Sequence, residues 1–110
     1  MSPQLTATLR KVLAAHYRGK DDPKYLIGGL IRIAGEPTFT TKLAVESLRA
    51  ARKMLGEALV GEGTLQEAVQ DPRNGAIIQE WSLANSYCLR RSNGRDPIPL
   101  LVEDEPSVSG

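Results

Sequence analysis

Apolar residues recur at helical spacing from the start of the chain. Leu5, Leu9 and Val12 are four and three residues apart, which places them on one face of a helix. The Ser2-Pro3 pair before them combines an N-cap residue with a proline at the first helical position, where its missing N–H is not needed. The pattern therefore predicts a first helix that ends near Tyr17.

Two interpretations fit the apolar segment at residues 24–33. As a helix, it places Leu26, Leu30 and Ile33 on one face. As two strands, it forms a hairpin whose turn is the Gly-Gly pair at residues 28–29. Two interior glycines weaken a helix by about 1 kcal/mol each relative to alanine, but a lone hairpin with arms this short is marginal in water. We favour the helix and keep the hairpin as the alternative.

Three further helices follow from the same kind of pattern. The longest is predicted over residues 43–60, where apolar side chains step by four and three residues. A capping-box sequence at residues 64–67 predicts a short helix to about Gln70. A break at residues 71–75, which contain proline and glycine, precedes a last helix over about residues 76–91. Together with the first two segments, these make four or five helices.

Residues 95–110 differ in character from the rest of the chain. Pro97 and Pro99 exclude a regular helix across this segment and favour an extended backbone. We therefore predict an all-α protein, with a compact bundle of four to five short helices in residues 1–94 and an extended, acidic C-terminal tail in residues 95–110. The tail either folds back over the protein's own core or binds a partner. Its candidate partner-binding residues are Ile98, Leu100, Leu101, Val102, Glu103, Asp104 and Glu105.

Length and composition limit the kinds of protein this can be. The 110 residues suffice for one domain, and 41% hydrophobic with 25% charged residues are ordinary values for a globular protein. The start of the chain does not resemble a signal peptide, and the longest strongly apolar run without a charge is residues 25–31. Together with a single cysteine, which cannot form an internal disulfide, these features predict a soluble cytoplasmic protein without a membrane partner.

Few residues could support catalysis or metal binding. The one histidine, His16, lies on or beside the apolar face of the first helix, so we interpret it as a partly buried structural residue. The one cysteine, Cys88, shares the apolar face of the last helix, so we interpret it as a small core residue. One histidine and one cysteine cannot make a zinc site of the usual Cys/His kind. We therefore expect no enzyme activity, no catalytic residue, no metal or other cofactor, and no small-molecule substrate.

The net charge of +1 hides an asymmetry between the two halves of the chain. Residues 1–55 carry a net charge of +6 and residues 56–110 one of −5. A basic half is typical of proteins that contact phosphates, although the pI of about 7.9 is below the values above 9 typical of nucleic-acid binders. The five aromatic residues are spread over the predicted elements, which argues against a platform for stacking bases. The candidate nucleic-acid-binding residues are Arg10, Lys11, Arg18, Lys20, Lys24, Lys42, Arg49, Arg52 and Lys53.

These observations favour a small protein that recognises other macromolecules. The leading hypothesis is a non-enzymatic protein–protein interaction module, such as an adaptor, regulator, inhibitor or assembly subunit, that acts through a helical face and the C-terminal tail. Its partner would be another protein or a second copy of this chain. The alternative is a nucleic-acid-binding regulatory protein that contacts phosphates through its basic N-terminal half.

Overall fold

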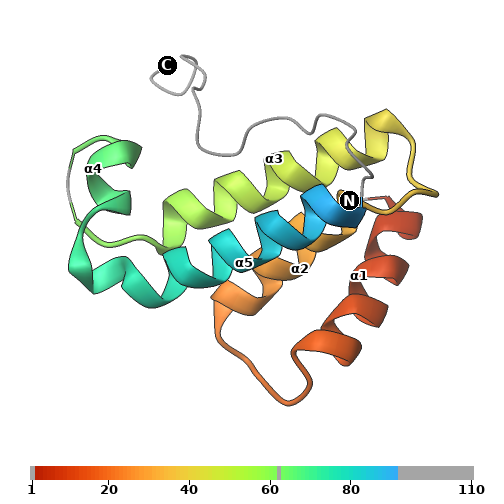
Figure 1. The fold of residues 1–110 in the computed structure, drawn as a ribbon, viewed down its shortest axis with the longest axis horizontal. Coiled ribbons are helices and arrows are strands. Elements are labelled where there is room, and N and C mark those ends of the chain that lie inside the picture. The colour runs from red at the N-terminus through yellow and green to blue at the C-terminus, as the bar shows by residue number, and fades with distance from the viewer. Residues whose placement is uncertain (1, 62, 92–110) are drawn as a thin grey trace.

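A computed structural model describes residues 2–61 and 63–91 of the chain. Over these two ranges the structure contains helices and connecting turns and no strand (Figure 1). The all-α prediction is therefore confirmed, whereas the predicted tail at residues 95–110 lies outside the described residues. In chain order, the helices are α1 (Pro3–His16), α2 (Pro23–Ile33), α3 (Thr41–Ala58), α4 (Leu65–Val69), a short 3₁₀ turn (Pro72–Asn74) and α5 (Gly75–Arg91).

Helix α2 is the central element of the bundle. Helices α1, α3 and α5 all pack directly against it; α3 runs antiparallel to α2, whereas α5 runs in the same direction as α2 (Figure 1). The side chains of Leu30, Ile31 and Ile33 are fully buried, although Ile31 and Ile33 point to opposite sides of the helix. A helix that is apolar on all sides is typical of a buried position. The helix interpretation of residues 24–33 is confirmed, and the hairpin alternative is wrong.

The paired glycines of α2 have a packing role that explains their presence inside a helix. A Cβ atom at Gly29 would lie 2.9 Å from Cδ1 of Leu9 and 3.1 Å from Cδ2 of Leu13. The missing side chain therefore lets α1 lie close against α2. The loss of helix propensity at this position is offset by tighter packing between the two helices.

Side chains cap the first turn of four of the described helices. The Thr64 hydroxyl accepts a hydrogen bond from the Glu67 backbone at 3.1 Å, and the Glu67 carboxylate accepts one from the Thr64 backbone at 2.9 Å. The two hydrogen bonds of the predicted capping box are thus both present. The other α-helices with a side-chain cap are α1, α2 and α3, whose capping residues are Ser2, Asp22 and Thr40.

The boundaries of α3 differ from the prediction for a local reason. The Thr40 hydroxyl accepts a hydrogen bond from the backbone of Leu43, so the helix begins at Thr41. At the other end, Leu59 has an extended backbone and terminates the helix at Ala58, before the predicted end. Apolar spacing locates the buried face of a helix, but capping residues set its ends.

The buried core joins residues from all the long helices. On α5, Trp81, Ala84 and Cys88 form the inner side, as the sequence pattern predicts. The interpretation of Cys88 as a core residue is confirmed, since 1% of it is exposed. Within the part of the chain that the structure describes, no helix is long and apolar enough to cross a membrane.

Helix α4 stands away from the bundle and is tied to it through Asn74 (Figure 1). The Asn74 side chain accepts a hydrogen bond from the Val60 backbone N–H at 2.9 Å and donates to the Val60 carbonyl at 3.0 Å. It also donates to the Ala68 carbonyl at 2.7 Å. The buried side-chain amide of Asn74 thus links the end of α3, the end of α4 and the start of α5 by hydrogen bonds.

Candidate functional site

A buried polar network joins α1, α2 and α5 through Tyr17, Arg32 and Glu80. The Tyr17 hydroxyl donates a hydrogen bond to the Glu80 carboxylate, and Nε of Arg32 donates to the Tyr17 hydroxyl oxygen at 2.7 Å. A second Arg32 nitrogen lies 3.5 Å from the same carboxylate. Tyr17 is 5% exposed, and the side chains of Arg32 and Glu80 are 13% exposed each. These groups satisfy one another and join the helices, and among the described residues no buried side-chain N or O atom lacks a hydrogen-bond partner.

Gly28 provides the space that the network needs. A Cβ atom at this position would lie 2.5 Å from the Tyr17 hydroxyl oxygen and 3.0 Å from the Glu80 carboxylate. Any larger residue would push the tyrosine away from α2. The second interior glycine of α2 is therefore explained by the polar network, as Gly29 is explained by helix packing.

Burial changes the acid–base behaviour of Tyr17. Desolvation first, and then the hydrogen bond to Glu80, raise the pKa of Tyr17 from 10.0 to about 12, while Arg32 acts in the opposite direction. The folded protein therefore favours the protonated phenol more than the unfolded chain does. The resulting stabilisation is fully present below pH 10 and is lost as the pH rises toward 12.

This difference predicts a specific pH dependence of stability. Between pH 10 and 12, the free energy of unfolding should fall more steeply in the wild type than in Tyr17→Phe, which has no phenol to ionise. Urea denaturation at several pH values measures both curves. The loss of lysine charge affects both proteins alike, so the difference between the curves isolates Tyr17. Parallel curves would show that the pKa of Tyr17 is the same in the folded and unfolded chain.

Aromatic rings surround the guanidinium group of Arg32. Its carbon lies 5.4 Å from the ring centroid of Tyr17 and 4.9 Å from that of Tyr87. Tyr25 extends the cluster, because its ring lies 5.0 Å from that of Tyr17. Cation–π contacts of this kind add to the ion pair with Glu80 and hold the charged group in place.

The aromatic residues are thus more clustered than the sequence suggests. The expectation that they are spread over the elements is wrong for Tyr17, Tyr25 and Tyr87, which three separate segments bring together. The exposed side of the cluster is occupied by lysines, since Nζ of Lys20 and Nζ of Lys24 lie 5.0 and 4.9 Å from the Tyr25 centroid. The rings are therefore engaged with cations of this chain.

The interpretation of His16 as partly buried is wrong. The residue is exposed at the end of α1, although the edge of its ring contacts Tyr87 at a centroid distance of 5.3 Å. Partial desolvation, followed by the nearby charge of Arg32, lowers its pKa below 6.5, and Glu80 opposes this effect. The helix ends one residue earlier than predicted, and Tyr17 rather than His16 points into the protein.

The nine candidate nucleic-acid-binding residues do not form one surface. Figure 1 places the α1–α2 connection and α3 at opposite edges of the bundle. The exposed members are Arg10 and Lys11 on α1, Arg18 and Lys20 after it, and Lys42, Arg49 and Lys53 on α3. Lys24 and Arg52 are half-buried, and Lys24 pairs with Asp22 at 3.2 Å. The row on α3 is the group that most resembles a continuous basic surface.

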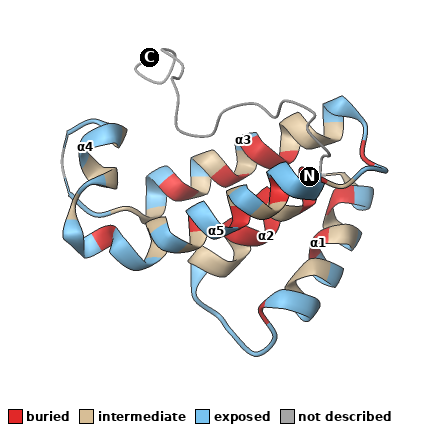
Figure 2. Cartoon of the chain, viewed as in Figure 1, coloured by how far each residue is buried: buried red, intermediate tan, exposed pale blue. Residues whose placement is uncertain are grey.

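The outward face of α5 carries two large apolar side chains. Leu83 is 53% exposed and Leu89 is 44% exposed. At about 100° per residue, they lie on either side of Ser86, which faces away from the buried side of the helix. Figure 2 shows exposed segments alternating with buried ones along α5, as expected of a helix with one side in the core and one in solvent. Around the helix axis, Ser82 and Ser86 lie between these two leucines. We call Leu83, Leu89, Ser82 and Ser86 the α5 outer face.

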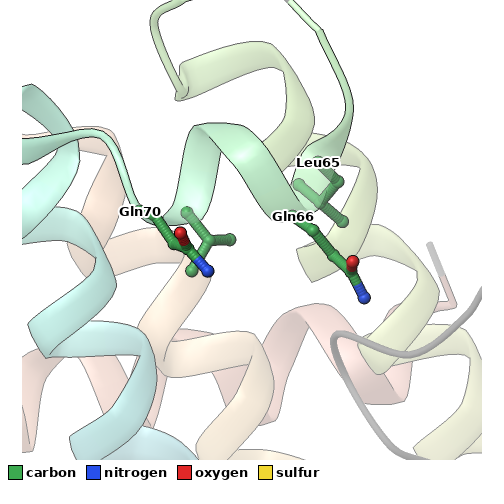
Figure 3. A pocket seen from close by; sticks show the side chains of 4 residues that line it. Leu65, Gln66 and Gln70 are labelled. Atoms are coloured by element: carbon green, nitrogen blue, oxygen red, sulfur yellow. The ribbon is translucent and has the colours of Figure 1, made fainter.

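A shallow hollow of about 340 Å³ lies beside α4. It is lined by Leu65, Gln66, Val69 and Gln70, and Figure 3 shows the labelled side chains along one side of this short helix. Two apolar and two amide side chains offer no charged or nucleophilic group. The hollow is therefore a feature of the α4 surface and provides no chemistry for a reaction.

The remaining candidate residues are placed as follows. The candidate partner-binding residues of the tail, Ile98 to Glu105, lie outside the described residues. In residues 2–61 and 63–91, no cluster of three or more His, Cys, Asp or Glu side chains could hold a metal ion. The exposed Leu83 and Leu89 were not predicted, because the apolar spacing of the last helix indicates its buried face and not the opposite one.

Comparison with known proteins adds no assignment to these observations. No protein-family model, curated protein or solved structure matches the chain. The functional argument therefore depends on the residues and contacts described above.

Proposed function

We propose that this protein is a non-enzymatic protein–protein interaction module that binds its partner through the α5 outer face and the C-terminal tail. The observation that carries the proposal is the exposure of Leu83 and Leu89 on one face of the helix that leads into the tail. Single exposed leucines are common on protein surfaces. Two of them, on the helix that leads into a segment with four more apolar residues, favour a binding surface.

The α5 outer face lies on a well-anchored helix. Trp81, Ala84 and Cys88 bury its inner side. Asn74 joins its start to α3 and α4, and near its end Arg91 pairs with Glu36 at 3.0 Å. A surface on a rigid element loses little conformational entropy when it binds, so even a modest apolar contact contributes to affinity.

The partner that this surface fits is another protein or a second copy of this chain. Two exposed leucines with serine hydroxyls between them offer apolar area and hydrogen-bonding groups to the surface of another protein. The same proposal places the protein in the cytoplasm, because its one cysteine is a buried core residue and needs no oxidising environment.

A second candidate function, nucleic-acid binding, is favoured by the basic row on α3. Lys42, Arg49 and Lys53 are exposed, and Lys42 and Arg49 are two helical turns apart on the same side. Such a row could contact successive phosphates. Glu46 and Glu57 lie on α3 near the same side and reduce its positive charge, so we rank this candidate second.

An affinity-capture comparison distinguishes the two functions. The full chain, its Leu83→Ser/Leu89→Ser variant and a Val60→Ser variant are immobilised and exposed to lysate of the native cells, with and without nuclease. Val60 is a matched control, because it is 44% exposed but lies near α4. We expect one or more proteins to bind the wild type and Val60→Ser, to resist nuclease, and to be lost from the double variant.

Two results would contradict the proposed function. Equal retention of the same proteins by the wild type and the double variant would show that the α5 outer face does not bind them. Retention that disappears after nuclease treatment would assign the protein to nucleic-acid binding. In that case, Lys42→Glu/Arg49→Glu/Lys53→Glu should abolish retention, and binding should fall steeply with added salt.

A further inference from the structure

We propose that two copies of this chain associate through the outward side of α3, with the two helices antiparallel about a two-fold axis near the middle of α3. In this arrangement Lys42 pairs with Glu57 of the other copy and Glu46 with Lys53, each pair occurring twice. The inference goes beyond the proposed function, because it concerns a different helix and names a second copy as the occupant. Its test uses the purified chain alone, so it stands or fails separately from the capture experiment.

Four charged side chains lie together on the outward side of α3. At about 100° per residue, all four fall within about 60° of one another around the helix axis; they are Lys42, Glu46, Lys53 and Glu57. Ala51 and Leu55, which are fully buried, lie on the opposite side. Figure 1 shows α3 along one edge of the bundle, where its inner side packs against α2. The charged side of the helix therefore faces away from the core.

These charges are not neutralised by close contacts of the chain itself. Lys42, Lys53 and Glu57 are exposed, and within residues 2–61 and 63–91 none of the three makes a hydrogen bond or ion pair. The half-buried Glu46 uses one carboxylate oxygen to accept a hydrogen bond from the Ser2 backbone at 3.0 Å, so its second oxygen can accept another. Pairs four residues apart within α3 have lysine before glutamate, which is the weaker order in a helix.

The order of these charges along α3 is self-complementary. Residues 42 and 57 have their midpoint between positions 49 and 50, and residues 46 and 53 have the same midpoint. A two-fold axis at that point places opposite charges against each other at both pairs, because it brings residue i to j and j to i. The pairs span about 22 and 10 Å along the helix, so the contacts extend over most of its 18 residues. A parallel arrangement would place each charge against its own copy.

Arg49 limits the strength of this association. It lies beside the two-fold axis, so the arginines of the two copies repel each other there. Exposed ion pairs are individually weak, and salt reduces the screening length from about 10 Å at 0.1 M to about 3 Å at 1 M. The association is therefore weak and sensitive to salt. Arg49→Gln, which removes the repulsion, should associate more tightly than the wild type, and weaker association of this variant would contradict the two-fold arrangement.

An exchange of charges tests the pairing of Lys42 with Glu57. At low salt, translational diffusion measured by NMR should slow as the wild-type concentration rises. Lys42→Glu and Glu57→Lys each place like charges together at two positions, so either variant alone should lose this dependence. An equimolar mixture of the two variants restores both ion pairs and should regain it. Lys11→Glu is the matched control, because it makes the same charge change at an exposed position of α1 and should diffuse like the wild type.

Cross-linking with a carbodiimide identifies the contact directly, since this reagent joins an amine to a carboxylate only at close range. In a mixture of ¹⁴N- and ¹⁵N-labelled chains, mass spectrometry should find Lys42 of one chain joined to Glu57 of the other. Two results would overturn the inference: wild-type diffusion that does not change with concentration, and a variant mixture that behaves like each variant alone. A third is that α3 takes up a polyphosphate instead, in which case Glu57→Lys would bind single-stranded DNA more tightly and the wild type would not self-associate.

Discussion

Replacing Gly35 with alanine is expected to lower the free energy of unfolding by about 3 kcal/mol. A Cβ atom at Gly35 would lie 2.5 Å from the carbonyl oxygen of Cys88 and 3.0 Å from its Cα. Both are backbone atoms within α5, so no side-chain rotation can relieve the clash, and α2 must separate from α5. Urea denaturation followed by the fluorescence of Trp81, the one tryptophan, measures the loss.

The matched control for this substitution is Gly56→Ala. Gly56 lies inside α3 and is exposed, and a Cβ atom there would have no neighbour within 4 Å. Alanine should therefore stabilise the helix by about 0.5–1 kcal/mol, because the backbone loses less entropy on folding. If both substitutions changed stability alike, close packing between the end of α2 and α5 would not be what Gly35 provides.

Glu80→Ala is expected to lower the free energy of unfolding by about 2 kcal/mol. The substitution removes the acceptor of the Tyr17 hydroxyl and the carboxylate that pairs with Arg32, leaving a cation whose side chain is only 13% exposed. Groups left without partners in this way lose their interactions with protein without regaining full hydration. Thermal and urea denaturation measure the change.

Glu80→Gln separates the hydrogen bond from the charge. Glutamine keeps an oxygen that can accept from Tyr17 but no longer neutralises Arg32. We expect Glu80→Gln to lower the free energy of unfolding by roughly half as much as Glu80→Ala does. A Glu80→Ala protein as stable as the wild type would mean that the polar network does not help to hold α1, α2 and α5 together.

The helices could be predicted from the sequence because each has a local cause. The cap at Ser2 and the capping box at residues 64–67 act over three residues, and apolar spacing repeats within each helix. Even the ambiguous segment at residues 24–33 could be assigned, by comparing the cost of two glycines inside a helix with the low stability of a short isolated hairpin. What the local pattern does not contain is the reason for its glycines, which depends on side chains contributed by α1 and α5.

The polar network could not be predicted, because its members are far apart in the sequence. Arg32 is 15 residues from Tyr17 and 48 residues from Glu80. No spacing rule connects them, and only the packing of α1 and α5 against α2 brings them together. The same separation in sequence explains why the tyrosine cluster was not predicted.

The candidate surface was only partly accessible from sequence. The exposed positions of Leu83 and Leu89 follow from the helical spacing of α5 once its buried side is known. The relative positions of the nine cations do not follow from spacing within one helix, because they depend on where α1 and α3 lie in the bundle. The structure divides these residues into separate groups, which weakens the nucleic-acid alternative and leaves the α5 outer face as the better candidate.

The proposed function depends on recognition of another protein through the α5 outer face. The most direct measurement is the dissociation constant, by titration calorimetry, of a protein captured by the wild type. Leu83→Ser/Leu89→Ser should weaken binding at least tenfold, which corresponds to about 1.4 kcal/mol, while Val60→Ser should bind like the wild type. Equal dissociation constants for the wild type, the double variant and Val60→Ser would contradict the proposed function.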